Sequence, residues 1–169
     1  MLERMMTIVP AVTPADIEIV RELFREYERS LGVDLSFQGF EHELASLPGS
    51  YAPPRGRLFL ARADAEAGGC IALRPLSGDR CEMKRLYLRP SLRGKGAGRA
   101  LAMQVIDEAR VIGYRTMRLD TLPMMSEAIA LYESLGFRRI PAYYASPVPG
   151  TLYMERALED VRNGPGGAR

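Results

Sequence analysis

The stretch from residue 85 to residue 101 constrains the fold of this chain more than any other part of it. It begins as a strand-like run that Pro90 ends, continues as a loop, and opens a long helical pattern. The loop, Arg93-Gly94-Lys95-Gly96-Ala97-Gly98-Arg99, has glycine at every second position. A helix that begins directly after such a loop presents free N–H groups and the positive end of its dipole. The segment therefore predicts an anion site between a strand and a helix, in an α/β fold.

The composition of the loop favours a diphosphate as the anion. Gly94, Gly96 and Gly98 let the backbone approach the ligand closely, and Arg93, Lys95 and Arg99 add positive charge. A Walker loop needs Gly-Lys followed by Ser or Thr, and the chain has no such set at this place. The dinucleotide fingerprint needs Gly-x-Gly-x-x-Gly, and the spacing here is different.

Two motifs in order resemble those of the GCN5-related N-acetyltransferases, the GNAT family. Arg93 to Gly98 match the family's pyrophosphate pattern, Arg/Gln-x-x-Gly-x-Gly/Ala. Leu86-Tyr87-Leu88-Arg89-Pro90 is similar to the strand end before that loop. Ala130 to Phe137, with Tyr132 and Gly136-Phe137, is similar to the family's later helix. The resemblance extends from Ile8 to Arg156, which is nearly the whole chain.

The resemblance and the residue patterns together predict one domain over residues 1–162 and a flexible, glycine-rich tail over 163–169. The fold class is α/β (α+β mixed), with a central mixed, mostly antiparallel twisted sheet flanked by helices. Helical periodicity predicts helices from Thr13 to Gly32 and over 37–47, 98–112 and 126–135, the last closed by Gly136. Strands are expected over 5–9, 57–63, 69–74, 80–88, 114–121, 137–140 and 152–156, with a turn at 66–68. Along 80–88, one face is expected to carry Cys81, Met83, Arg85 and Tyr87 and the other Glu82, Lys84, Leu86 and Leu88.

The expected activity follows from the resemblance. It implies an acetyl-CoA-dependent N-acetyltransferase that moves the acetyl group directly to a primary amine, without a covalent enzyme intermediate. Acetyl-CoA is the only cofactor expected. The residues expected to bind it are Leu86, Tyr87, Leu88, Arg93, Gly94, Lys95, Gly96, Ala97, Gly98 and Arg99, with a backbone N–H of Leu86, Tyr87 or Leu88 on the thioester carbonyl.

Two side chains are the candidate catalytic groups. Tyr132 matches the family's tyrosine position and is the expected general acid, because a phenol with a pKa of about 10 can protonate a thiolate. The competing interpretation is a core tyrosine that shares a helix face with Ile129 and Leu135. Glu82 is the expected base, acting through water, and the alternative is a solvated charge paired with Arg80 or Lys84.

The acceptor side of the site is less determined by the sequence. Relatives often carry Asn where this chain has Met125, so that contact is lost or is supplied by Ser126, which also resembles a helix cap. Residues 141–150, with Tyr143 and Tyr144, are expected to form an aromatic wall or, equally, an ordinary packed connection. Arg74 is better explained as a surface arginine than as a ligand for a carboxylate.

Several functions remain open on the sequence alone. A small-molecule amine is the expected acceptor, a protein lysine or N-terminus is the alternative, and a non-catalytic acyl-CoA-binding sensor is the third. A homodimer is a further expectation from the family. A nucleic-acid partner is not expected, because the net charge is only +2 and the basic stretch from Arg89 to Arg99 is short.

Composition also bears on thiol chemistry, metal binding and membrane association. Cys70 and Cys81 lie in apolar, strand-like surroundings and are expected to be buried thiols rather than a nucleophile or a bridge. With His42 as the single histidine there is no zinc pattern, so no metal is expected. No apolar run approaches membrane-spanning length and Met1 to Thr7 contain no signal-peptide pattern, so no membrane partner and a cytoplasmic location are expected.

Overall fold

A single mixed sheet organises the computed structural model, which describes residues 5–159. Its strand order is β1-β2-β3-β4-β5-β7-β6. Only the β4–β5 pair is parallel, and every other neighbouring pair is antiparallel. The strands are β1 Met6–Pro10, β2 Arg57–Ala63, β3 Glu66–Pro75, β4 Arg80–Leu88, β5 Thr116–Thr121, β6 Arg138–Ile140 and β7 Leu152–Ala157. The predicted fold class is confirmed, whereas the domain boundary at 162 and the tail lie outside the described residues.

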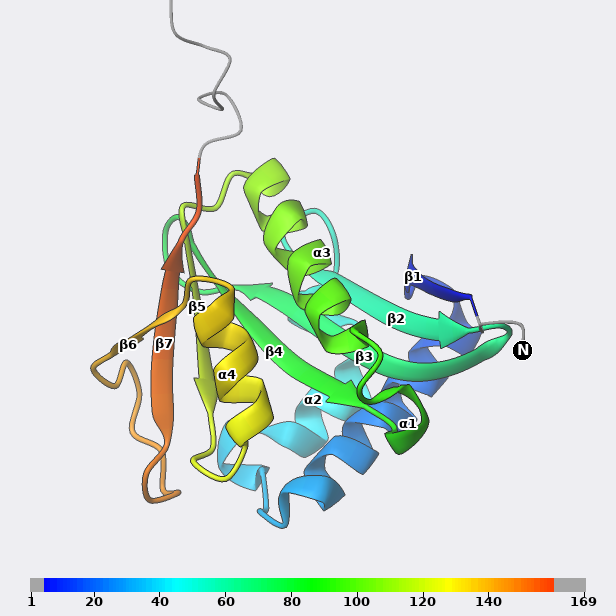
Figure 1. Ribbon diagram of the computed structural model, residues 1–169, viewed down its shortest axis with the longest axis horizontal. Coiled ribbons are helices and arrows are strands. Elements are labelled where there is room, and N and C mark those ends of the chain that lie inside the picture. Colours follow the sequence, from blue (N-terminus) through cyan, green and yellow to red (C-terminus); the bar gives the residue numbers. More distant parts are fainter. Residues whose placement is uncertain (1–4, 160–169) are drawn as a thin grey trace, which may run out of the picture.

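Helices cover both faces of the sheet (Figure 1). One face carries α1 Pro14–Leu31 and α2 Phe40–Ser46, and the other carries α3 Ala97–Ile112 and α4 Ser126–Ser134. The described residues also contain three short 3₁₀ helices: η1 Ser36–Gln38, η2 Gly49–Tyr51 and η3 Pro90–Leu92. Each face has its own buried hydrophobic cluster, so the sheet is covered twice and both sides of β2, β3 and β4 are buried.

The first helix begins and ends where its sequence signals predict. The Thr13 hydroxyl accepts from the Asp16 N–H at 3.1 Å, and the Asp16 carboxylate accepts from the Thr13 N–H at 3.3 Å. This reciprocal capping box satisfies two N–H groups that the helix itself cannot. Val20, Leu23 and Phe24 are fully buried on the inner face. Gly32 ends the helix in the left-handed conformation, with φ 65°.

Two local predictions need correction. The helix expected over 37–47 is interrupted at Gly39, whose φ of 70° separates η1 from α2. The hairpin turn expected at 66–68 lies at residues 64–65, because Asp64 takes the left-handed conformation, with φ 56°.

The alternation predicted along β4 is wrong after Lys84. It placed Arg85 with Cys81 and Met83, and Leu86 with Lys84. In the structure Arg85 has φ 61°, and the β3–β4 register shifts at this point. The extra residue is a β-bulge, and it exchanges the two faces of the strand. Leu86 therefore joins Met83 in the α3-side cluster, whereas Arg85 lies on the α1–α2 side with Lys84.

Candidate active site

Strands β4 and β5 diverge soon after they begin, and this opens the candidate site. They pair only over Arg80–Glu82 and Thr116–Arg118. Beyond that point a groove of about 460 Å³ lies between the end of β4, the start of α3 and the first turn of α4. It is lined by Tyr27, Ser30, Leu86, Tyr87, Leu88, Arg93, Gly98, Met124, Met125, Ser126, Glu127, Ala128 and Leu131.

The start of α3 leaves backbone groups exposed at one end of this groove. Gly96 is the N-cap residue and no side chain caps the helix. Gly94 and Gly96 have φ of 74° and 78°, and a Cβ added to either would meet nothing within 4 Å. An α-helix has no internal acceptor for its first N–H groups. The loop therefore offers uncovered donors with the positive end of the α3 dipole behind them.

The structure brings together half of the predicted cofactor residues. Leu86, Tyr87, Leu88, Arg93 and Gly98 all line the groove. Arg93 also donates from Nε to the Leu88 carbonyl at 3.0 Å, which holds the loop against the strand end.

The remaining predicted cofactor residues lie at or beyond the rim of the groove. Gly94, Lys95 and Gly96 are exposed next to it. Arg99 is also exposed and donates to the Ser134 hydroxyl on α4 at 2.7 Å. Ala97 is 1% exposed in the α3-side core, so only its backbone is placed to contact a ligand.

Most of the opposite wall of the groove was not predicted from the sequence. Residues 124–128 and Leu131 come from the turn before α4 and from α4 itself, and Tyr27 and Ser30 come from α1. The only available signal was the position of Met125, seven residues before Tyr132. Ser126 is the first residue of α4, and the N-cap residue is Met125 without a side-chain hydrogen bond, so Ser126 does not cap this helix.

A small inner cavity of about 30 Å³ continues the groove toward the sheet. Tyr27, Leu86 and Met125 line both. Tyr132 lines the inner cavity, is 6% exposed and stacks edge-on against Phe137, with 5.9 Å between ring centroids. Burial raises the pKa of Tyr132 above its usual range, so the phenol keeps its proton at neutral pH. Tyr132 therefore both packs in the core and borders the inner cavity, so its position is compatible with either interpretation.

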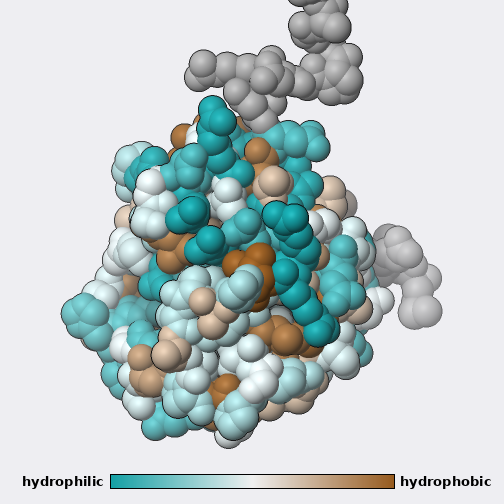
Figure 2. Space-filling model, turned by 90° about the vertical axis from the view of Figure 1, so that its left-hand side faces the viewer, coloured by the Kyte–Doolittle hydropathy of each residue, from teal (hydrophilic) through white to brown (hydrophobic). Residues whose placement is uncertain are grey.

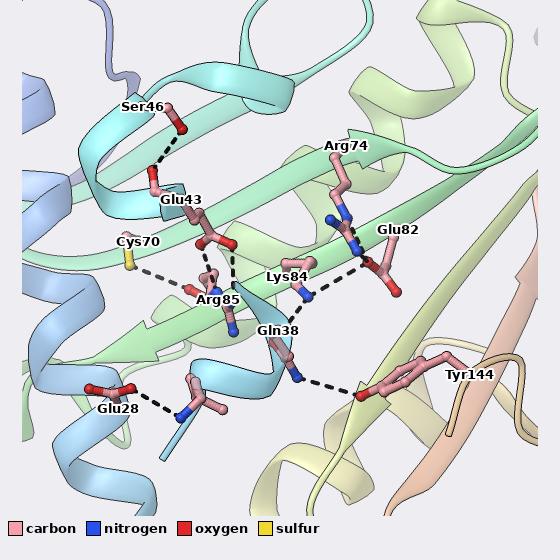
Figure 3. Close-up of polar contacts among 11 residues, drawn as sticks. Glu28, Gln38, Glu43, Ser46, Cys70, Arg74, Glu82, Lys84, Arg85 and Tyr144 are labelled. Carbon is pink, nitrogen blue, oxygen red and sulfur yellow. Dashed lines mark hydrogen bonds and ion pairs between the residues drawn. The ribbon is translucent and has the colours of Figure 1, made fainter. Parts of the chain in front are cut away.

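Glu82 lies at the centre of a polar network rather than on a cavity wall (Figure 3). Its Oε1 accepts from Arg74 at 2.7 Å, and its Oε2 accepts from the Tyr143 hydroxyl at 2.6 Å. The Lys84 Nζ lies 3.8 Å from the same Oε1. Glu82 is 1% exposed, so the alternative is wrong in calling the charge solvated, although its pairing with Lys84 is present. Arg74 is partly exposed, at 35% of its side chain, and is the main counter-ion of Glu82.

The bulge residue Arg85 is fixed by a buried ion pair (Figure 3). Its Nε and Nη2 donate to the two Glu43 carboxylate oxygens at 2.9 and 3.0 Å. The guanidinium also lies over the Phe40 ring at 5.2 Å and the Tyr27 ring at 5.8 Å. This pair ties α2 to the strand at the point where the strand turns toward the groove.

Tyr143 and Tyr144, from residues 141–150, form an aromatic wall together with Tyr153 of β7. The rings of Tyr143, Tyr144 and Tyr153 contact one another edge-on, with centroids 5.2 to 5.7 Å apart. Two hydroxyls fasten the wall to the sheet, because Tyr143 donates to Glu82 and Tyr144 donates to Asp120. An outer cavity of about 20 Å³ lies behind Tyr144 and shares Tyr27, Gln38, Asp120 and Thr121 with the inner cavity.

The described part of the chain contains no cluster of three or more His, Cys, Asp or Glu arranged to hold a metal ion. Within residues 5–159 no helix is both long enough and apolar enough to cross a membrane.

Comparison with known proteins connects this geometry to one family. The model of the acetyltransferase (GNAT) family matches residues 17–137. An uncharacterised N-acetyltransferase of Schizosaccharomyces pombe is 41% identical over 143 residues, covering 83% of this chain and 88% of the relative. An IAA acetyltransferase of Azospirillum brasilense is 34% identical over 143 residues, covering 83% and 92%. A crystal structure from Klebsiella pneumoniae, named as an acyl-CoA N-acyltransferase, is 28% identical with a TM-score of 0.69, covering 92% of this chain and 99% of that one.

Proposed function

The chain belongs to the acetyltransferase (GNAT) family and is an N-acetyltransferase, and from this premise we propose that it moves an acetyl group from acetyl-CoA to the primary amine of a small molecule. The observation that carries this proposal is one continuous path. It runs from the uncapped start of α3, along the groove, to Tyr132 in the inner cavity.

Coenzyme A fits this path from end to end. The exposed N–H groups of residues 94–99, with Arg93 and Lys95, would hold the diphosphate. The diverging end of β4 leaves the backbone of Leu86, Tyr87 and Leu88 free of a β5 partner, so it can pair with pantetheine as an added strand would. The same backbone would place an N–H on the thioester carbonyl, which becomes negative in the transition state.

Tyr132 is the proposed general acid. Transfer forms the N–C bond and breaks the C–S bond, and the departing thiolate needs a proton. A buried phenol whose pKa is raised by desolvation stays protonated and can donate it.

Attack on the thioester requires that the amine first lose a proton. We retain Glu82 as the proposed base, but its carboxylate does not line any of the three cavities described. It would act through water. In Glu82→Gln kcat should fall about a hundredfold, since the proposed general base has been removed. An unchanged kcat would remove Glu82 from this role.

A small acceptor is favoured over a protein by the shape of the acceptor side. The inner and outer cavities are small and lie behind the wall that Tyr144 fastens to Asp120. A protein lysine would need an open groove at this place. The relative from Azospirillum brasilense carries a name that refers to one compound, IAA, in keeping with a small acceptor.

The test combines binding and turnover in the full-length protein. Calorimetry with acetyl-CoA should show one site, and release of the CoA thiol should follow when an amine from a small-molecule panel is added. Tight binding without thiol release for any small amine, peptide or protein amine would instead support the acyl-CoA sensor. Release with peptides alone would support a protein acetyltransferase.

A further inference from the structure

The inner cavity is lined by Lys84, whose single ion pair is the long one to Glu82 at 3.8 Å, and by Asp120, which has no ion-pair partner among residues 5–159. Arg85 is neutralised by Glu43, and Arg74 by Glu82, at distances of 2.7 to 3.0 Å. Lys84 and Asp120 are the other charged residues that line the cavity. None of the ion pairs among residues 5–159 includes Asp120. The cavity therefore presents opposite charges to whatever occupies it.

Lys84 has donor capacity to spare. Its ammonium donates to the Gln38 Oε1 at 3.2 Å and lies 3.8 Å from the Glu82 Oε1 (Figure 3). Both Glu82 oxygens already accept shorter bonds, from Arg74 and Tyr143. An ammonium has three N–H donors, so at least one remains for a ligand. The side chain is 6% exposed, so a donor there acts where water screens charge weakly.

Asp120 faces the same cavity from the adjacent strand. It is held in place by the Tyr144 hydroxyl, which donates to its Oδ2. Tyr144 is in turn connected to Lys84 through Gln38, whose Nε2 donates to the Tyr144 hydroxyl at 3.5 Å. The chain from Lys84 through Gln38 and Tyr144 to Asp120 thus fixes the spacing of the two charges.

The size of the cavity limits how far apart the matching charges of a ligand can be. A volume of about 30 Å³ holds only a few atoms. An ammonium and a carboxylate that both contact its wall must therefore be joined by a very short linker. The α-amino acid head group, with one carbon between the two, is the common amine that meets this requirement.

Resting on the acetyl transfer proposed above, we propose that the acceptor is an α-amino acid, whose carboxylate binds Lys84 and whose amino group binds Asp120 next to Tyr132. The amino nitrogen forms a bond to the acetyl carbon, and the C–S bond breaks. Of the two protons that the ammonium loses, one returns to the CoA thiolate through Tyr132 and the other goes to solvent.

Matched pairs of amines test this assignment. Each amino acid is compared with the amine that lacks its carboxylate: leucine with isopentylamine, phenylalanine with phenethylamine, and alanine with ethylamine. CoA release should give a kcat/KM about tenfold to a hundredfold higher for the amino acid in at least one pair, as expected for one charge-assisted bond. In Lys84→Met that ratio should fall toward one, chiefly through a higher KM for the amino acid.

Two further variants on β4, one at Arg80 and one at Lys84, serve as controls. Arg80→Met removes an exposed cation of the same strand that lines none of the cavities described, and it should leave the ratio unchanged. Lys84→Arg keeps the charge and should restore part of the ratio. A thermal unfolding scan of each variant confirms that it is folded.

The outcomes separate this inference from the proposed function. Equal turnover of both members of every pair, or a ratio that survives Lys84→Met, would overturn the amino-acid assignment and leave acetyl transfer standing. No CoA release with any amine would overturn the proposed function and this inference with it.

Discussion

The side chain of Tyr132 has two parts that can be tested separately: its ring packs in the core and its hydroxyl is the proposed general acid. Tyr132→Phe keeps the ring against Phe137 and removes only the hydroxyl. We expect kcat to fall about a hundredfold, the usual size of a general-acid contribution, with little change in acetyl-CoA affinity. Initial rates of CoA release measure this.

The control for Tyr132 is another buried tyrosine. Tyr114 is 3% exposed and donates to the Arg55 carbonyl at 2.8 Å, away from the cavities described. Tyr114→Phe should leave kcat unchanged. If both variants turn over at the wild-type rate, Tyr132 is a core residue and the proton comes from elsewhere.

The buried Glu43–Arg85 ion pair contributes to the stability of the fold. Glu43→Gln leaves the buried Arg85 guanidinium without its counter-ion, so the free energy of unfolding should fall by about 3 kcal/mol. Glu41→Gln, on the same helix but 72% exposed, should change it by less than about 0.5 kcal/mol. Urea unfolding of both variants measures the difference. A loss below about 1 kcal/mol in Glu43→Gln would mean that the pair contributes little.

The same pair predicts a pH effect. Burial alone would raise the pKa of Glu43, but the hydrogen bonds and charge of Arg85 outweigh it and the net shift is downward. A lowered carboxyl pKa stabilises the fold above the unfolded-state value of about 4.3, and this stability is lost as pH falls through the folded-state value. Urea unfolding of the wild type should therefore show a loss on acidification that is smaller in Glu43→Gln.

At the scale of single residues, the sequence predicted chemistry only where a motif accompanied it. Tyr132, Arg93 and Gly98 were found because two motifs stand in order along the chain, and all three line the predicted path. Lys84 and Asp120 were not proposed as site residues, because nothing in a single sequence shows that two neighbouring strands diverge. The network around Glu82 was missed for the same reason, since its members come from three separate segments.

Among the elements, α1 depends on its capping box. Thr13→Ala removes the acceptor for the Asp16 N–H, which the helix cannot satisfy itself, so unfolding should require about 1 kcal/mol less free energy. Thr13→Ser keeps the hydroxyl and should retain most of the stability. Thermal unfolding of the two variants gives the comparison, and equal losses would show that the cap is not the cause.

Helices and strands with a strong hydrophobic periodicity were predictable, and the irregular ones were not. The α3 pattern gave a helix that begins within one residue of the observed start and ends at the observed residue, because its apolar face repeats with a clear helical period. The β4 alternation failed at Arg85, since a bulge depends on the register with β3 and not on local preference. That bulge turns Leu86 toward the groove, so the least predictable part of the strand is the part that builds the site.

For the whole molecule, the two cysteines can show whether the hydrophobic clusters on the two faces of the sheet stay closed, because Cys81 lies in one cluster and Cys70 in the other. Cys70 and Cys81 are fully buried, and burial raises the pKa of both thiols, that of Cys81 to about 12. A thiol reagent at neutral pH should therefore find no reactive cysteine in the native protein and two after unfolding. The native protein would then contribute no background to an assay of CoA release. Reaction of one thiol before unfolding would show that one core opens locally.

The homodimer and the cytoplasmic location stay predictions, and the surface around the edge strand β6 bears on the first of them. On the face that carries the β6–β7 edge, hydrophobic residues form small separate areas among hydrophilic ones (Figure 2). The edge strand β6 carries Arg138 and Arg139, both exposed, and charges on an edge strand discourage pairing with another chain. Dimer formation through this edge is therefore not favoured.

The proposed function of the whole molecule depends on one contact, between the amino terminus of α3 and the diphosphate of coenzyme A. The NMR chemical shifts of the backbone amides can detect this contact in the wild-type protein, without any substitution. On addition of coenzyme A the largest shifts should fall on the amides of residues 94–99, and pantetheine, which lacks the diphosphate, should leave those amides unmoved. Shifts centred on another part of the chain, or equal shifts with both ligands, would contradict this account.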